Sequence, residues 1–240
     1  MQVQAVTPTP SFQPFATRGA SVPTGGLAEA YGPPFPAGTV TSLASGRELF
    51  AQGESADYWY KVESGVLRTC RLLPDGRRQI DAFALPGDFV GFEAGRIHTV
   101  AAEAVTPATV VRYARSRIEA LADADAPFGR RLLSIALKQL GMAQERQLLL
   151  GRMTAEERLA AFLLEMSERA GGGDTIDLPM SRSDIGDYLA LTIETVSRTL
   201  SAFKAQGVVS LPNRQRVVIE DRNSLESFDC RDRPIASLVA

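Results

Sequence analysis

The spacing of apolar positions changes character at about residue 125. Before it, apolar and polar residues alternate in short runs such as "DYWYKVESGVLRTCRLL" and "QIDAFALPGDFVGF", and turn glycines recur every ten to twelve residues. A Pro-Asp-Gly turn at residues 74–76 separates the two runs. Period-two alternation between turn signals is typical of strands. The pattern therefore predicts an all-β roll or sandwich over residues 40–125.

Beyond this point the apolar residues recur at helical spacing. Pro127 stands where a first helical turn tolerates a missing N–H group, and the pattern predicts one long helix over residues 126–152. Small and apolar residues form a stripe along it: Leu133, Ala136, Leu137, Leu140 and Ala143, followed by Leu150. Such a stripe suits a coiled-coil-like dimer helix. Packing against the chain's own roll is the alternative, and the two are compatible.

Further helix signals follow. Thr154 and Glu157 have the spacing of a capping box at the start of "AEERLAAFLLEMSER", which "AGGGD" ends. In "SRSDIGDYLALTIETVSRTLSAFKAQGVV", Ser181 and Thr192 can each cap a helix, with a tight turn at residues 190–191 between them. The apolar face of the first helix is Ile185, Tyr188 and Leu189. Gly186 suits a close approach of two helices, so the segment predicts a helix-turn-helix.

The second of these helices has two distinct faces. Three apolar residues at i, i+4 and i+7 are expected to be buried: Val196, Leu200 and Phe203. Four polar residues share the opposite face: Glu194, Ser197, Arg198 and Ser201. Arginine can fork onto guanine, glutamate can accept from cytosine, and serine can serve several bases. We therefore expect this face to read DNA, with the glutamate and the arginine orienting each other.

A wing is predicted after Gly207, because "VVSLPNRQRVVIE" reads as strand, Pro-Asn turn and strand. It would bring Arg214 and Arg216 within reach of phosphate. Residues 179–219 hold five basic and three acidic residues, a net charge of +2 in a chain whose net charge is −2. An ordinary helical hairpin within a larger core is the alternative to a DNA-reading helix.

Composition separates tails from domains. Seven of the 14 prolines lie in residues 1–36, which predicts a flexible tail over residues 1–38, or alternatively an arm docked through Phe12, Phe15 or Phe35. The remaining domains are expected to be a β-roll over 39–125, the dimerisation helix, and a winged helix-turn-helix over 153–226. Residues 227–240 would be a C-terminal tail, whose "SLVA" end suits protease recognition or simple disorder. The whole is an α+β chain.

The remaining residue counts limit the class of protein. The sequence has no apolar run long enough to span a membrane and no signal-peptide pattern, so we expect a cytoplasmic protein. Two cysteines, Cys70 and Cys230, cannot build a disulfide framework, and oxidative control through Cys230 is a hypothesis. His98 is the only histidine, which excludes a metal-dependent barrel enzyme and a nucleophile–base pair. We expect no enzyme activity.

The order of β-roll, long helix and winged helix-turn-helix resembles the Crp/Fnr family of bacterial transcription regulators over about residues 40–225. "LPGDFVGF" is similar to the family's sensor-roll motif, and "SRSDIGDYLALTIETVSR" to its DNA-binding core. The roll would then be of the jelly-roll, cyclic-nucleotide-binding type. Glu-x-x-Ser-Arg resembles the Fnr/FixK branch rather than the cyclic-AMP receptor branch. Ala190 departs from relatives that often have glycine in the turn.

The resemblance implies a homodimer that binds double-stranded DNA and RNA polymerase. Glu194, Ser197 and Arg198 would read TTGA half-sites in a TTGAT-N4-ATCAA palindrome. The full expected DNA-contacting set adds Thr192, Ile193, Thr195, Ser181, Arg182, Arg214 and Arg216. The loop of residues 91–98 would face the polymerase. Neighbours of the FixK type serve oxygen-limited respiration, denitrification and nitrogen fixation, and act without a cofactor.

A β-roll of this kind could bind one of three effectors: a cyclic nucleotide, an iron–sulfur cluster or haem. The segment "GDFVGFEAGRIHTVAAEA" lacks the family's Arg-Ser pair for cyclic nucleotides and offers only Arg96 as a cation. Two cysteines are too few for a [4Fe–4S] cluster, which needs about four thiolates. Haem held by His98, Cys70 or a methionine stays open. We therefore expect no cofactor. The alternatives are a regulator gated by a small ligand or haem, and an interaction module whose helix-turn-helix packs on protein.

Overall fold

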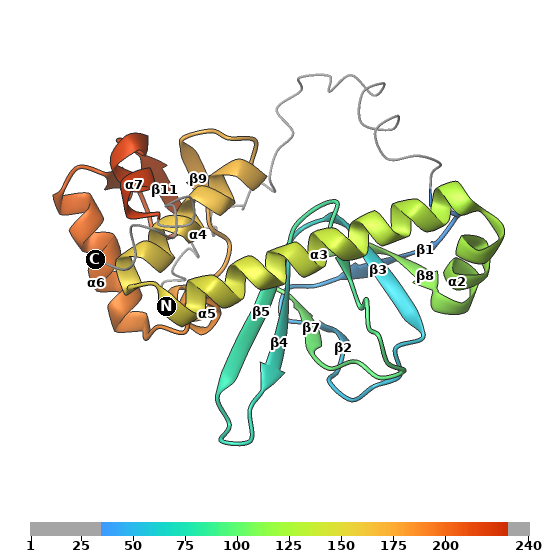
Figure 1. The fold of residues 1–240 in the computed structure, drawn as a ribbon. Helices are drawn as coiled ribbons and strands as arrows, with labels where there is room; N and C mark the ends of the chain where they lie inside the picture. Colours follow the sequence, from blue (N-terminus) through green and yellow to red (C-terminus); the bar gives the residue numbers. More distant parts are fainter. Residues whose placement is uncertain (1–34, 230–240) are drawn as a thin grey trace, which may run out of the picture.

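The computed structural model describes residues 35–229 (Figure 1). Most of the predicted N-terminal tail, with Phe12 and Phe15, lies outside these residues, as do Cys230 and the "SLVA" terminus. Within them the predicted α+β architecture is confirmed: an N-terminal roll, a long helix, and a C-terminal winged helix-turn-helix.

The roll consists of two antiparallel sheets. The first has the order β1 (Thr39–Leu43), β8 (Ala108–Ala114), β3 (Tyr58–Ser64) and β6 (Phe89–Val90). The second has the order β2 (Glu48–Phe50), β7 (Ala101–Ala104), β4 (Leu67–Leu72) and β5 (Arg78–Ala84). Inward-facing residues pack as one cluster that includes Phe50, Val62, Leu67, Val90 and Val110. Since successive strand residues point to opposite faces, the alternation in the sequence produces this core.

The prediction that residues 40–125 are all β is wrong at its end, where α2 (Arg115–Ala124) follows β8 directly. Ala114 precedes this helix without a capping side chain, and neither glycine nor proline separates helix from strand. The usual signals of a helix start are therefore missing from the sequence. Tertiary packing holds α2 instead, because Ile118 is completely buried beside Tyr113 and Phe128.

Phe35, which the sequence assigns to the flexible tail, packs on the roll. The centroid of its ring lies 4.8 Å from that of Phe89 and 5.2 Å from that of Phe128. The Arg131 guanidinium lies 4.8 Å from the centroid of the same ring. The docked-arm alternative therefore holds for this residue, and the packed part of the chain begins before residue 39.

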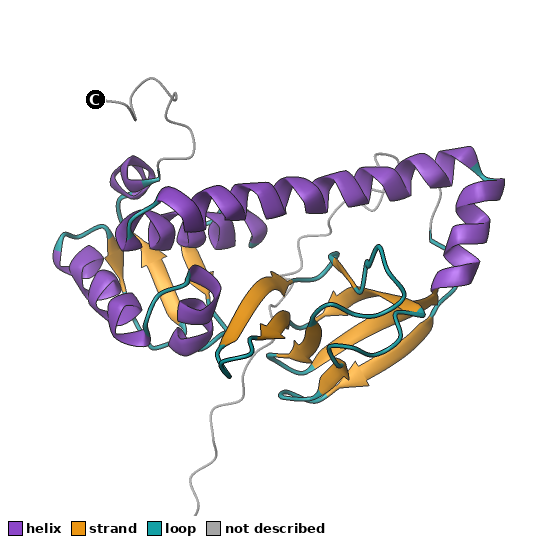
Figure 2. Ribbon diagram, turned by 60° about the horizontal axis from the view of Figure 1, so that its bottom comes forward, coloured by secondary structure: helices purple, strands orange, loops and turns teal. Residues whose placement is uncertain are grey.

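The long helix α3 (Ala126–Arg152) reaches from the roll to the C-terminal domain (Figure 2). Its inner face packs on its own chain: Phe128 and Leu149 are buried, and the Gln139 amide donates to the Phe89 carbonyl at 3.0 Å. The predicted dimer stripe is uncovered, with Leu133, Leu137 and Leu140 exposed by 58%, 57% and 54%. Ala136 and Ala143 are exposed on the same helix. Neither α3 nor any other described helix is long and apolar enough to cross a bilayer.

The C-terminal domain contains α4 (Ala155–Arg169), β9 (Thr175–Asp177), α5 (Arg182–Leu189), α6 (Ile193–Ala205), β10 (Val209–Ser210), β11 (Arg216–Ile219) and α7 (Arg222–Phe228). The strands pair antiparallel in the order β10–β11–β9, so the wing was predicted but β9 was missed. Both β9 and α7 are too short for a periodic pattern to stand out. α7 crosses the boundary predicted at residue 226, and the centroid of its Phe228 ring lies 5.0 Å from that of Phe203.

One hydrophobic cluster joins the two domains. It contains Val66, Ile80 and Phe83 from the roll, together with the end of α3 and the buried faces of α4, α5 and α6. On its polar side, the Arg158 guanidinium donates to carbonyls near the ends of α3 and α5, those of Leu150 (3.0 Å), Met153 (2.9 Å) and Leu189 (3.0 Å). Helix ends leave such carbonyls without intrahelical partners. The winged helix-turn-helix is therefore packed against the roll and the long helix.

Gly65, in the turn between β3 and β4, is expected to be a critical glycine of the roll. Its φ is +78°, and a Cβ there would lie 2.3 Å from the Pro107 carbonyl oxygen. Gly46 has a similar φ of +76° but open space around it, so Gly46→Ala isolates the conformational cost. We expect Gly46→Ala to lower the free energy of unfolding by about 1 kcal/mol and Gly65→Ala by about 3 kcal/mol. Urea denaturation at one protein concentration measures both, and equal losses would contradict the steric explanation.

Candidate nucleic-acid interface

Both helices of the predicted helix-turn-helix begin at the expected caps. The Ser181 hydroxyl accepts from the Asp184 backbone N–H at 3.0 Å, and the Asp184 carboxylate accepts from the Ser181 backbone N–H at 3.1 Å. This is a capping box with aspartate in the place of the usual glutamate. At the second helix the Thr192 hydroxyl accepts from the Thr195 N–H at 3.2 Å.

The turn between α5 and α6 has the tight geometry that the sequence predicted. Ala190 adopts a left-handed conformation with φ 54°, the one positive φ of a non-glycine residue in the described chain. That conformation costs an alanine about 1 kcal/mol. The Leu191 N–H donates to the Gly186 carbonyl at 2.9 Å, and a Cβ on Gly186 would lie 2.7 Å from the Leu191 carbonyl oxygen. Gly186 is therefore required where the turn closes on α5.

The two faces of α6 are divided as predicted. Val196, Leu200 and Phe203 are at most 1% exposed and join the core cluster. Glu194, Arg198 and Ser201 are exposed on the other side, and Ser197 is half-buried. Figure 1 shows α6 on the outside of the C-terminal domain. The polar face of α6 is thus open to a large partner.

Glu194 and Arg198 do not pair with each other, although they stand four residues apart on one helix. Within residues 35–229 neither side chain makes an ion pair or a hydrogen bond. The mutual orientation of the two side chains was expected over base pairs, and it stays a prediction for the DNA-bound protein. Both charged groups are consequently available to an external partner, without an internal ion pair that has to be broken first.

The arginines of the wing differ in their surroundings. Arg216 forms two bonds with the Asp177 carboxylate of β9, at 2.7 and 3.1 Å, so its charge is compensated inside the domain. Arg214 is exposed at the wing tip. Burial, and after it the charge of Arg214, lowers the pKa of Arg182. Two cations that interact in this way favour a site for anions such as phosphate. Arg182 and Arg214 are therefore better candidates for phosphate contacts than Arg216, whose charge is already compensated by Asp177.

Comparison with known proteins agrees with this geometry. The model of the Crp-like helix-turn-helix domain matches residues 157–228, and that of the cyclic nucleotide-binding domain matches residues 40–125. The chain is 45% identical over 197 residues to the nitrogen fixation regulation protein FixK of Azorhizobium caulinodans, covering 80% of this chain and 79% of the relative. It is 41% identical over 175 residues to the transcriptional activatory protein AadR of Rhodopseudomonas palustris, covering 71% and 73%.

Among solved structures, FixK2 from Bradyrhizobium japonicum matches with a TM-score of 0.78 and 43% identity, over 81% of this chain and 98% of FixK2. The chain belongs to the Crp/Fnr family, in its FixK-like group. Its members compared above are transcription regulators, so this Crp/Fnr protein is a DNA-binding regulator and not an enzyme.

The other predicted contact residues of this Crp/Fnr protein lie around the start of each helix. The hydroxyls of Ser181 and Thr192 serve as caps, and that of Ser181 also donates to the Asp184 carboxylate at 2.8 Å. The hydroxyl oxygens of Thr192 and Thr195 are 3.0 Å apart. Ile193 is 46% exposed at the first turn of α6 and offers an apolar surface there. The hydroxyls thus shape the helix starts, and Ile193 is free for contact.

The sequence did not reveal that the acidic residues of α5 face the roll. Asp184 is 4% exposed and meets Arg68 at 2.9 Å and Arg78 at 2.5 Å. Asp187 meets Arg78 at 2.7 Å. These partners are more than a hundred residues apart in sequence, so no local pattern signals the contact.

The interior of the roll is filled around His98. Its ring is 1% exposed and stacks on Phe50, with centroids 3.7 Å apart. The Nδ1 atom lies 4.0 Å from the Glu93 carboxylate, which is too far for a hydrogen bond. Burial lowers the pKa of His98, and the charge of Glu93 opposes that shift. His98 is therefore a packing residue of the roll in this structure.

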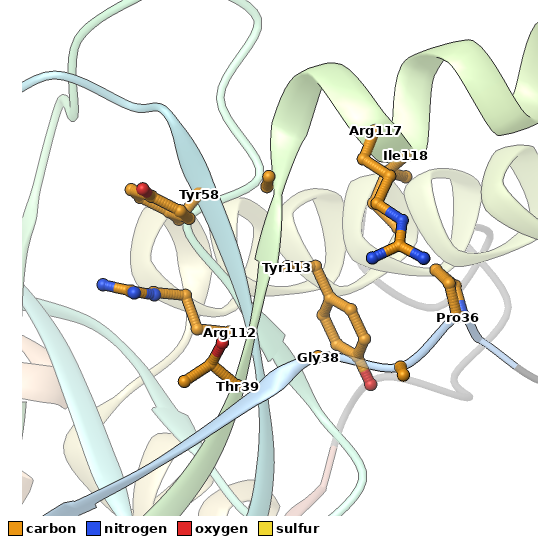
Figure 3. Close-up of a pocket in the computed structure, with 10 residues that line it drawn as sticks. Pro36, Gly38, Thr39, Tyr58, Arg112, Tyr113, Arg117 and Ile118 are labelled. Atoms are coloured by element: carbon orange, nitrogen blue, oxygen red, sulfur yellow. The ribbon is translucent and has the colours of Figure 1, made fainter.

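A cavity of about 250 Å³ lies where β1, β3 and β8 meet α2 (Figure 3). The Arg112 guanidinium is 4.4 Å from the centroid of the Tyr58 ring on one side, and Tyr113 and Arg117 are on the other. Arg96, the one cation of the segment that would correspond to a cyclic-nucleotide site (residues 87–104), does not line this cavity. The cavity is thus distinct from that segment.

The difference between Arg214 and Arg216 predicts different effects on DNA binding. Arg214→Ala is expected to weaken binding to all sequences and to lower the slope of log K against log salt by about one, because a free phosphate contact is lost. Arg216→Ala should change the slope by less, since Asp177 already compensates its charge. Titrations by fluorescence anisotropy at several salt concentrations measure both slopes. A larger change for Arg216→Ala would contradict this assignment.

Proposed function

We propose that this Crp/Fnr protein is a homodimeric transcription activator that reads TTGAT-N4-ATCAA-like palindromes without a bound cofactor. Its targets would be genes of oxygen-limited metabolism, including respiration, denitrification and nitrogen fixation. The names of the relatives support this assignment: one is a nitrogen fixation regulation protein and another a transcriptional activatory protein.

The observation that carries the proposal is the distribution of unpaired charge. Asp184, Asp187 and Arg216 have partners within the chain, whereas Glu194 and Arg198 have none among residues 35–229 and share one exposed face of α6. In a helix that enters the major groove, the arginine would bind guanine O6 and N7 and the glutamate would accept from cytosine N4. Ser197 lies between them, which matches the Glu-x-x-Ser-Arg pattern that we associate with TTGA half-sites.

The exposed stripe of α3 supports a homodimer. Leu133, Leu137 and Leu140 lie at i, i+4 and i+7 and each keeps more than half of its surface in contact with solvent. A second copy of the same helix would cover such a stripe by coiled-coil packing. Two helix-turn-helix units joined in this way read two half-sites about one helical turn of DNA apart, which is what a palindrome requires.

The residues of the roll support action without a cofactor. The chain has two cysteines and one histidine, and that histidine is stacked in the core. In the described range no group of three or more His, Cys, Asp or Glu side chains is arranged so that it could hold a metal ion. RNA polymerase would be contacted through the loop of residues 91–98, where Ile97 is 57% exposed.

Binding by the metal-free protein is the first test. We expect purified protein, treated with a chelator, to shift a TTGAT-N4-ATCAA duplex with a Kd on the order of 10⁻⁸ M or below. Two chains should bind each duplex, and a duplex with one half-site scrambled should bind far more weakly, because only one of the two reading helices then meets its sequence.

Each other outcome favours a different protein. Binding only after cyclic AMP or haem is added would favour a regulator gated by an effector in the roll. No binding even at low salt would favour a helix-turn-helix that packs on protein. Tight binding that is equal for the palindrome and for a scrambled duplex would overturn the sequence reading given above.

Arg198→Ala tests the assignment of bases. We expect it to cost about 1–3 kcal/mol of binding free energy on the palindrome and to relax the preference for guanine in the half-site. Lys204→Ala is the matched control, since Lys204 is also an exposed cation of α6 but lies in the last turn, outside the predicted reading set. Binding to duplexes with each base at the guanine position measures the preference. If Arg198→Ala weakens all four duplexes equally, the arginine contacts phosphate.

A further inference from the structure

The β4–β5 hairpin of the roll lies against the first helix of the helix-turn-helix (Figures 1 and 2). Arg68 of β4 donates to the Asp184 carboxylate at 2.9 Å, and Arg78 of β5 donates to the same carboxylate at 2.5 Å. Arg78 also donates to the Asp187 carboxylate at 2.9 and 2.7 Å. We call this set of four residues the hairpin clamp.

Backbone contacts accompany the hairpin clamp. The Gln79 amide donates to the Asp187 carbonyl at 2.8 Å. Arg146 of α3 donates to the Tyr188 carbonyl at 3.0 Å and also to the carbonyls of Ile80 and Asp81 in β5. The first turn of α5 is therefore bound to the roll through the Asp184 carboxylate, and the last turn through the carboxylate and carbonyl of Asp187. Arg146 of α3 adds a contact to the last turn.

Asp184 has two roles that connect the roll with the start of α5. Its carboxylate is buried between two guanidiniums, and it also accepts from the Ser181 N–H and hydroxyl in the capping box. A buried carboxylate needs compensation by opposite charge and hydrogen bonds. If Arg68 and Arg78 were lost, the charge of Asp184 would favour a solvent-exposed position, and α5 would have to leave the hairpin.

The orientation of α5 sets that of α6. The tight turn through Gly186 and Leu191 allows little freedom between the helices, and Leu189 packs with Val196 and Leu200 in one cluster. The hairpin clamp therefore acts on the reading helix through a rigid unit. It leaves the polar face of α6 uncovered, because its own contacts lie on α5.

We propose that Arg68 and Arg78 are positioning residues for DNA binding, and that the hairpin clamp holds the reading helix in the orientation that fits DNA. This rests on the proposed function, and it names what takes the place of an effector in a protein that binds without one. In this arrangement the roll fixes the orientation of the winged helix-turn-helix. The fraction of chains with a docked α5 then limits the apparent affinity for DNA.

The test compares Arg68→Gln/Arg78→Gln with Arg77→Gln in the full chain. Arg77 is an arginine of the same hairpin whose side chain, within residues 35–229, bonds only to Asp75 at the exposed tip, so it controls for the loss of positive charge there. We expect the double variant to bind the palindrome on the order of 10-fold more weakly, with unchanged base preference and unchanged salt slope. Arg77→Gln should stay within about twofold of the wild type, a change too small to count as lost coupling.

Amide hydrogen exchange provides a readout that does not depend on DNA. In the double variant, exchange should rise in residues 67–84 and 182–189 while β3 and β8 keep the protection of the wild type. A general rise over the whole roll would mean loss of folding, and the single variant Arg78→Gln, which leaves Arg68 on Asp184, then serves for the comparison.

Three outcomes would overturn the proposal. Unchanged affinity together with faster exchange at the interface would mean that docking of α5 is irrelevant to binding. Tighter binding would mean that the hairpin clamp restrains the helix instead of positioning it. A salt slope lowered by about one per arginine would mean that Arg68 and Arg78 contact phosphate directly. Failure of the wild type to bind the palindrome would instead refute the proposed function, and the exchange result would still report on the hairpin clamp.

Discussion

The burial of Asp184 is the constraint around which the two domains are arranged. A carboxylate that is 4% exposed is tolerated only with opposite charge and hydrogen bonds close by, and here the charge comes from Arg68 and Arg78 of the roll. The hydrogen bonds come from the N–H and hydroxyl groups of Ser181, the N-cap of α5. The Asp184 carboxylate therefore takes part both in the capping box of α5 and in the contact with the roll. The capping of α5 and its packing against the β4–β5 hairpin thus depend on the same carboxylate.

The same principle explains how charge is divided over the C-terminal domain. Acidic residues on the side of α5 that meets the roll are compensated, and Arg216 is compensated by Asp177. Glu194 and Arg198 have no such partner in the described residues and face outward. Residues 179–219 have a net charge of +2 by their sequence. Two of their three acidic side chains, Asp184 and Asp187, form ion pairs with arginines of the roll. The surface that faces outward is therefore more positive than this net charge indicates.

Local signals in the sequence were sufficient for most of the fold and for the shape of the site. Caps at Ser181, Thr192 and Thr154, the i, i+4, i+7 spacing in α6, and alternation in the strands depend on residues close in sequence, and the structure confirms them. α2 was missed because tertiary packing, rather than a cap, specifies it. β9 and α7 were missed because they are too short for a periodic pattern to stand out, although Asp221 caps α7. Long-range ion pairs were beyond reach for a related reason: Arg78 gives no sign in the sequence of which carboxylate it meets.

Under the proposed function the roll serves a regulator without holding a ligand, and its packing is compatible with that role. Its interior is occupied by its own side chains, with His98 stacked on Phe50, while one sheet presents Ile80 and Phe83 to the cluster shared with the helix-turn-helix. A ligand in such a roll can change the orientation of the reading helix only if it binds the protein more tightly in one orientation than in the other. This difference in affinity is what shifts the equilibrium between the two conformations. Side chains of the roll that stabilise one orientation of the reading helix can do this without a ligand. The contacts from β4, β5 and α3 to α5 are of this kind. Under the proposed function the amount of protein, rather than the occupancy of a ligand site, would therefore set its output.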